Sequence, residues 1–353
     1  MDSKNIDLFY AACKGNLETI KSLLAADADL NERNKDGWTA LHNAAQNGQD
    51  KACELLMHGY AESFGDVKKF IMAKDKENRT ALHTAARYGQ TDTCELLMDS
   101  YEKAGGDLKE LISAKDKDSR TAIYWAAWNG HTKTCATLIE QYGKAGGDIR
   151  GIFTAKDKDG VTVLHFAAQN GQTKMCTMLI GEYSKIGDVK DILHSKDRKG
   201  KTALHWAAGR DQIETCKLLI EKGADVNAKN NDGETPLFWA ALNGYAETCK
   251  LLIDNGVDAE AKNKDGKTAL HLASLNGNVK AADLIIGKSG NIANEQDNAG
   301  KTALFYAAKK GHTGMCKFLV SKGADPKIKD NDGKTALDEA EGHGETKAFL
   351  ESI

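Results

Sequence analysis

Residues 231–244 read NDGETPLFWAALNG and hold a complete signal for a short helix. The hydroxyl oxygen of Thr235 can accept hydrogen bonds from the amides that open a helix, and Pro236 fits the first helical position because its missing N–H loses nothing there. One leucine and a pair of alanines follow at the spacing i, i+3 and i+4, which forms a single apolar stripe. Gly244 can take the left-handed backbone conformation that ends a helix. The stretch therefore predicts a helix with a face of small side chains that a neighbouring helix can approach closely.

The same signal recurs along the whole chain of 353 residues. A second segment with a cysteine and paired apolar residues follows nearly every copy, and Asp232-Gly233 predicts a tight hairpin turn between units. One such unit cannot bury its apolar face, but stacked units can, so the pattern predicts a one-dimensional solenoid. The spacing is 40–41 residues in the first half of the chain and 33–34 in the second, with copies that begin at Thr39, Thr80, Thr121, Thr162, Thr202, Thr235, Thr268, Thr302 and Thr335.

The segments KGADVNAK at 222–229 and NDGETPL at 231–237 resemble the ankyrin repeat, whose period is about 33 residues. The resemblance covers the whole chain, with nine full signatures and a degenerate first copy, LFYAACKGN, at 8–16. It implies an all-α solenoid of about ten helix-turn-helix units with short β-hairpin loops. It also implies that the first helices and the hairpins line a concave face that contacts partners.

Four regions follow from the repeat lengths. We assign a capping repeat to 1–33, four long repeats to 34–196, four standard repeats to 197–329 and a second capping repeat to 330–353. Each long repeat adds an aspartate followed by apolar residues at i, i+3 and i+4, which predicts a short third helix. These helices are expected to stack on one another as an extra layer, which either thickens the scaffold or forms a second binding surface. The four patterns occupy 66–71, 107–112, 148–153 and 188–193.

Composition limits the classes of function. The formal net charge of −3 gives no support to binding of nucleic acid or membranes. The first residues are too polar for a signal peptide, and no apolar run approaches the length of a membrane span. We therefore expect a monomeric cytoplasmic protein, or a delivered effector acting in a host cytosol if the source is a host-associated microbe.

The residue types that could carry chemistry occupy repeat positions. Seven of the eight cysteines share one place in their repeats and no Cys-x-x-Cys pair occurs, so we interpret them as small buried hydrophobic residues. Five repeats carry a histidine three residues after the signature threonine, and a hydrogen bond from its imidazole to hairpin backbone is expected. No arrangement of a nucleophile and a base stands apart from the repeat. The sequence thus predicts no enzyme activity, no metal and no cofactor.

All five tryptophans map to the predicted concave face. Trp128, Leu242 and Leu275 follow the alanine pair and should face outward, which favours a partner interface. For Trp125, Trp206 and Trp239, an interface anchor and half-buried scaffold remain alternatives. The residue before the signature threonine, predicted at the hairpin tip, is cationic in six of nine copies; it forms either a basic ridge for an acidic partner or ordinary solvated turn charge. The predicted partner-binding residues are Trp38, Arg79, Tyr88, Arg120, Trp125, Trp128, Phe166, Trp206, Arg210, Trp239, Leu242, Leu275 and Tyr306.

Two functions are consistent with this surface. The first is a non-catalytic scaffold that binds a protein or peptide partner on the concave face. The alternative is a reader of a methylated lysine or other cationic ligand, in which Trp125, Trp128, Phe166 and Trp206 form an aromatic cage.

Overall fold

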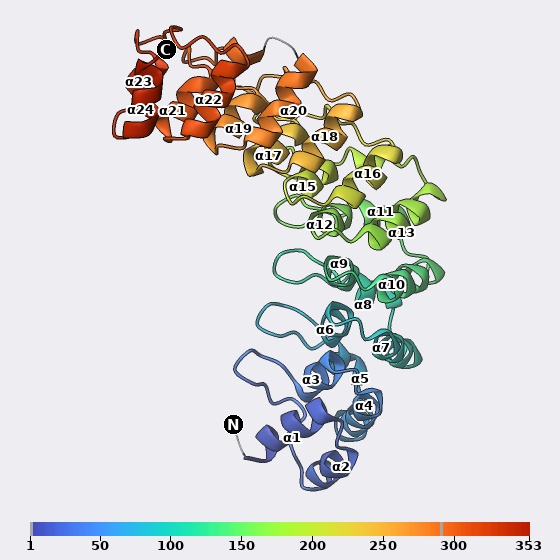
Figure 1. Cartoon of the computed structure of the whole chain (residues 1–353). Coiled ribbons are helices and arrows are strands. Elements are labelled where there is room, and N and C mark those ends of the chain that lie inside the picture. The colour runs from blue at the N-terminus through green and yellow to red at the C-terminus, as the bar shows by residue number, and fades with distance from the viewer. Residues whose placement is uncertain (1–2, 290–291) are drawn as a thin grey trace. The chain divides into compact units, whose positions relative to one another are not determined.

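The computed structural model describes residues 3–289 and 292–353 as successive helix pairs joined by hairpin loops (Figure 1). In every repeat after the first, a short first helix starts directly after the signature threonine, as the capping signal predicts. These first helices are α1 (Ser3–Lys14), α3 (Ala40–Gln46), α6 (Ala81–Arg87), α9 (Ala122–Trp128), α12 (Val163–Gln169), α15 (Ala203–Ala208), α17 (Pro236–Asn243), α19 (Ala269–Leu275), α21 (Ala303–Lys309) and α23 (Ala336–Glu339).

A second helix follows each first helix, and seven of the ten second helices carry a cysteine at one repeat position. The second helices are longer in the lengthened repeats than in the standard ones, by about one turn. They are α2 (Leu17–Ala25), α4 (Asp50–Phe64), α7 (Thr91–Lys103), α10 (Thr132–Lys144), α13 (Thr173–Ser184), α16 (Ile213–Glu221), α18 (Ala246–Asp254), α20 (Val279–Ser289), α22 (Thr313–Ser321) and α24 (Gly344–Glu351).

The chain packs as two compact units: unit 1 comprises residues 1–167 and 174–188, and unit 2 comprises 168–173 and 189–353. Within unit 1, α1, α3, α6 and α9 contact one another in order, as do α2, α4, α7 and α10. Within unit 2, the same two rows are α15, α17, α19, α21 and α23, and α16, α18, α20, α22 and α24. Within each unit, the repeats therefore bury their apolar stripes against one another, as in a solenoid.

The alanine pairs form the contact between first helices. Their side chains are fully buried, for example at Ala126 and Ala127 in α9 and at Ala240 and Ala241 in α17. Small side chains allow the helix backbones to approach closely, and the larger signature leucines fill the remaining space at close packing density. The cysteine prediction is confirmed for the second helices, where seven thiols are free and buried; burial raises the pKa of Cys135 to about 12.

The short third helices are also confirmed. They are α5 (Val67–Ile71), α8 (Leu108–Ser113), α11 (Ile149–Thr154) and α14 (Lys190–Leu193). Their main packing differs from the expected direct stack: α5 lies against α4 and α7, and α8 lies against α7 and α10. A tyrosine near the end of each long helix fixes this layer. Tyr60 stacks on Phe70 with ring centroids 4.5 Å apart, and the ring of Tyr183 meets Phe153 edge-on at 5.5 Å.

Two glycines allow the chain to turn under these tyrosine rings. A Cβ atom at Gly106 would lie 2.3 Å from the ring of Tyr101, and one at Gly147 would lie 2.3 Å from the ring of Tyr142. Any side chain at these positions would displace the ring. The Gly-Gly pairs of the long repeats are thus a packing requirement rather than a sign of a loose linker.

The hairpin loops differ from the β-hairpins that the resemblance implies. Among the described residues no segment forms a β-strand. Each loop is closed instead by one backbone pair, such as Asp75 N–H to Arg79 C=O at 2.9 Å, and adjoining loops are linked by single bonds such as Lys76 N–H to Asp36 C=O at 3.1 Å. Single bonds of this kind are too few for a ladder.

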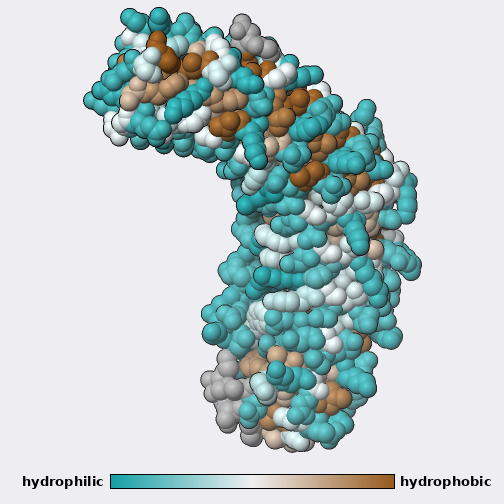
Figure 2. Space-filling model, in the orientation of Figure 1, coloured by the Kyte–Doolittle hydropathy of each residue, from teal (hydrophilic) through white to brown (hydrophobic). Residues whose placement is uncertain are grey.

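The face of the molecule shown in Figure 2 is mostly hydrophilic, and hydrophobic residues form small groups on it. More of these groups lie over helices of unit 2 than over the middle repeats of unit 1. Within the described ranges, no helix combines the length and the apolar character that crossing a bilayer requires.

Candidate binding surface

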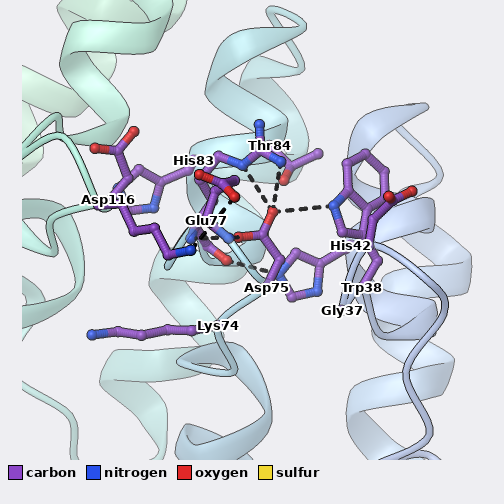
Figure 3. Close-up of polar contacts among 12 residues, drawn as sticks. Gly37, Trp38, His42, Lys74, Asp75, Glu77, His83, Thr84 and Asp116 are labelled. Carbon is purple, nitrogen blue, oxygen red and sulfur yellow. Dashed lines mark hydrogen bonds and ion pairs between the residues drawn. The ribbon is translucent and has the colours of Figure 1, made fainter.

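An aspartate or asparagine five residues before each signature threonine organises the hairpin. In the third repeat, Asp75 Oδ1 accepts the backbone N–H groups of Glu77 and Arg79, both at 2.8 Å. Its Oδ2 accepts Arg79 Nε at 2.8 Å and the indole Nε1 of Trp38 at 3.1 Å (Figure 3). The carboxylate is buried, and these bonds satisfy it. Local side-chain bonds of this type replace the ladder that a β-hairpin would supply.

The same carboxylate positions an aromatic side chain on the first helix. Asp116 accepts the indole Nε1 of Trp125 at 3.1 Å, and Asp197 accepts that of Trp206 at 3.0 Å. Tyr306 donates its hydroxyl to Asp297 in the same way, at 2.5 Å. The hydrogen bond therefore fixes the orientation of an aromatic side chain nine positions after the aspartate. This network was missed at the sequence level, although the recurrence of Asp or Asn before each signature was visible.

Trp239 is the exception, because its hairpin carries Asn230 in place of aspartate. Asn230 Oδ1 accepts the N–H groups of Asp232 and Glu234, both at 2.9 Å, and its Nδ2 donates to the Glu234 side chain at 3.0 Å. No acceptor remains for the indole, and the buried Nε1 of Trp239 has no hydrogen-bond partner among the described residues. A buried donor without an acceptor is a local cost to stability.

The signature histidines link consecutive repeats, as predicted. In unit 1, His42 Nδ1 accepts the N–H of Thr39 at 3.2 Å, so Nε2 carries the proton and donates to the C=O of Arg79 at 3.1 Å. In unit 2, His205 Nε2 donates to the C=O of Glu234 at 3.0 Å. Burial of the neutral imidazole lowers the pKa of both histidines to about 4. These histidines are structural ties rather than bases.

The aromatic residues of unit 1 cover one another. Trp125 is only 6% exposed, with the guanidinium groups of Arg87 and Arg120 4.6 and 4.5 Å from its ring. Trp128 stacks on Trp125 at 5.6 Å and on Phe166 at 4.3 Å, and Phe166 is 7% exposed. Trp125 is therefore more deeply buried than either of its two predicted alternatives implies, and Phe166, which was predicted to contact a partner, is also covered by its neighbours. Trp128 is the member of this stack that reaches the surface.

The rest of the predicted surface is more accessible. Tyr88 is 43% exposed and Arg210 is exposed, and Trp38, Trp206, Trp239, Leu242, Leu275 and Tyr306 are half-buried. Within each unit they lie on first helices, on the residue that follows one, or on the adjoining hairpin. Whether they contact a partner stays a prediction.

The residue before the signature threonine does not occupy the hairpin tip. In the third repeat the turn is formed by residues 75–78, and Arg79 comes after it, half-buried against Asp75 at 2.8 Å. Arg120 pairs with Asp116 at 3.0 Å and also with Asp118. In unit 2, Lys267 pairs with Asp265 and Lys301 with Glu339. Four of the six cations are thus neutralised within the fold, so the basic ridge is broken into separate ion pairs.

A pocket of about 350 Å³ opens in unit 2 between first helices α15 and α17. Its walls include Trp206, Gly209 and Trp239. Lys201 and Arg210 also line it. Among the described residues, no three His, Cys, Asp or Glu side chains are grouped as a metal site.

A family model that describes three consecutive ankyrin repeats matches seven overlapping segments of the chain, which together run from residue 8 to residue 350. The chain belongs to the ankyrin repeat family.

Short segments also match curated proteins. A segment of 50 residues, or 14% of this ankyrin chain, is 46% identical to 5% of protein phosphatase 1 regulatory subunit 12A of Mus musculus. A segment of 54 residues, or 15% of the chain, is 43% identical to 12% of the NAD-capped RNA hydrolase NUDT12 of Homo sapiens. The chain thus corresponds to a small part of each relative.

Proposed function

We propose that this ankyrin repeat protein is a non-catalytic scaffold that binds a protein or peptide partner through an inner strip. The inner strip comprises, in each repeat, the residue before the signature threonine and the residues four, seven and eight positions after it. Family membership supports the general role, since ankyrin repeats are interaction modules. The repeat network accounts for the buried histidines and aspartates, and this supports a role without catalysis.

One observation carries the proposal: large apolar side chains stand at a position where the fold does not need them. Seven residues after the signature threonine, the chain has Trp128, Leu242 and Leu275, all half-buried at the surface. Other repeats have Gln46 and Gln169 there and stack in the same way. At Leu242 and Leu275 the apolar choice is therefore explained by contact with a partner rather than by packing, whereas Trp128 also covers the rings of Trp125 and Phe166.

The aromatic cage for methylated lysine has less support. A cage requires several ring faces turned toward one cavity. In unit 1, Trp125, Trp128 and Phe166 instead stack face to face, and Arg120 already lies over Trp125. A second cation would meet repulsion as well as lack of space.

A reducing compartment such as the cytoplasm is part of the proposal, as is a monomeric state. All eight cysteines are free, and seven are buried in second helices at one repeat position. Free thiols in such number are typical of proteins that fold under reducing conditions.

The test uses glutamine, which the chain itself carries at the decisive position. Trp128→Gln combined with Leu242→Gln and Leu275→Gln should keep the protein folded, with a lower melting temperature because the ring of Trp128 stacks on Trp125 and Phe166. Affinity capture with quantitative mass spectrometry should then recover a partner with wild type and about tenfold less with the triple variant.

Ile186→Gln is the matched control, because it removes an exposed apolar side chain that lies outside the inner strip. It should capture the partner as wild type does. Equal capture by the triple variant and wild type would refute the inner strip as the binding surface.

A further inference from the structure

The sixth repeat departs from the pattern at the end of its first helix. Where neighbouring repeats read QNG at 169–171 and LNG at 242–244, this repeat reads GRD at 209–211. Asp211 takes the left-handed conformation of the missing glycine, with φ of 56°. The helix therefore ends normally while the inner strip loses one large side chain and gains an arginine.

Gly209 opens the pocket of unit 2. Its φ of −70° is an ordinary helical value, so the backbone there does not require glycine. A Cβ atom at this position would lie 3.2 Å from the backbone oxygen of His205, which is a tight contact, and 3.6 Å from Cβ of Trp239. A longer side chain, such as the leucine of the next repeat, would extend into the space between the two indoles. The pocket thus exists because this position is glycine.

The lining of the pocket combines apolar walls with positive charge. Lys201 Nζ lies 3.4 Å from the ring centroid of Trp239, and burial lowers the pKa of this lysine. Arg210 is exposed and makes no ion pair with any described residue. No carboxylate is among the lining residues. Three carboxylates outside the lining lie near Lys201. Asp197 is engaged by the indole of Trp206 and by hairpin amides, Glu234 accepts a hydrogen bond from Asn230, and Asp232 is the third.

We propose that this pocket receives a glutamate side chain from an acidic segment of the partner, an inference that rests on the proposed scaffold function. The two methylene groups of glutamate fit between indole walls, and its carboxylate can pair with Lys201 and Arg210. A cationic ligand is disfavoured by the two positive charges. A phosphate group is less well matched, because it is commonly bound by clusters of arginines or by backbone amides, and the lining offers one arginine.

The experiment uses the full chain and a phage-displayed library of random peptides. Wild type should enrich peptides with a glutamate, and replacing that glutamate by glutamine in a synthetic copy should weaken binding about tenfold. Gly209→Leu fills the pocket with the side chain that the next repeat has, and Arg210→Glu reverses one charge. Each should reduce affinity for the glutamate peptide at least about tenfold while the circular dichroism melt stays that of a folded protein.

Lys217→Glu makes the same charge change as a reversal in the pocket, but on the exposed face of α16. It should leave affinity unchanged. If glutamate peptides bind Gly209→Leu as well as wild type, or if selection shows no acidic preference, the pocket proposal is overturned while the scaffold function stands. If every peptide selected on wild type binds the Trp128→Gln, Leu242→Gln, Leu275→Gln triple variant with unchanged affinity, the scaffold proposal fails together with the pocket proposal.

Discussion

Trp125 in unit 1 and Trp239 in unit 2 occupy the same place in their repeats, yet their surroundings are opposite. The indole N–H of Trp125 donates to a carboxylate, the guanidinium groups of Arg87 and Arg120 lie near its ring, and Trp128 stacks on it. Trp239 has an unpartnered N–H, and its ring borders an open pocket beside Gly209. Side chains from adjacent positions, rather than the tryptophan itself, thus decide whether a ring is scaffold or is available to a ligand.

The largest expected effect is on the pH dependence of the free energy of unfolding. It comes from the buried neutral histidines, which both units contain. The folded pKa of His42, His83 and His205 is about 4, below the unfolded value of about 6.5. Unfolding therefore takes up protons between these values. Stability should be complete above about pH 6.5 and fall toward pH 4 by about 1.4 kcal/mol per pH unit for each histidine.

Denaturant unfolding at a series of pH values measures this slope. His83→Phe, which copies Phe238 and Phe305 of unit 2, should remove one histidine's share of it. A stability that stays constant between pH 7 and pH 5 would contradict the assignment of neutral imidazoles.

The second prediction concerns the extra layer, which only the lengthened repeats have. Phe153 in α11 is fully buried and packs against Tyr183. Phe153→Ala should cost about 3–5 kcal/mol, because it leaves a cavity in a closed core. Hydrogen exchange should show lost protection in unit 1 helices and little change in unit 2, since repeats couple to near neighbours. Uniform loss across both units would show that they unfold as one.

The third prediction compares the two indoles directly. Trp125→Phe removes the N–H that Asp116 accepts, whereas Trp239→Phe removes an N–H without a partner. Trp125→Phe should therefore be more destabilising than Trp239→Phe, by about 1–2 kcal/mol. Thermal melts of the two variants measure the difference, and equal destabilisation would show that the indole bond contributes nothing.

The smallest effect on stability should come from giving the Trp239 N–H the carboxylate acceptor that its hairpin lacks. Asn230→Asp with Glu234→Lys gives this hairpin the Asp-and-Lys combination found at Asp297 and Lys301. The new carboxylate can accept the Trp239 N–H, so stability should rise by about 1 kcal/mol. Asn230→Asp alone should gain less, because the aspartate would face Glu234. A loss of stability in the double variant would mean that Trp239 does not reach the hairpin.

The periodic features of the fold were predictable from sequence because each depends on local chemistry. The helix starts at signature threonines, the buried cysteines and the short third helices were all expected and found. The exposure of individual side chains could not be predicted, because it depends on residues from several repeats together. The pattern at Trp125 and Trp206 is the same, and only the surrounding Arg87, Arg120 and Trp128, or their absence, determines exposure.

Two further differences have clear physical causes. The residue before each signature threonine was placed at the hairpin tip, because the role of the preceding Asp or Asn in forming the turn had not been recognised. The pocket in unit 2 could have been found by comparing repeats position by position, since Gly209 stands where Leu242 and Leu275 do. Lys201 and Arg210, which supply its charge, lie nine residues apart, and the repeat pattern alone does not show that both side chains line one pocket.

The histidine tie has a consequence for how such a protein changes over generations. His42, His83, His205 and His271 bond to the backbone oxygen of Arg79, Arg120, Glu234 and Lys301, so the side chain at the receiving residue is irrelevant. A duplicated or shuffled repeat can therefore join its new neighbour without compensating mutations. Gene duplication can therefore lengthen the array, and genetic drift can change the residues that bind a partner. The histidine hydrogen bonds between consecutive repeats stay the same.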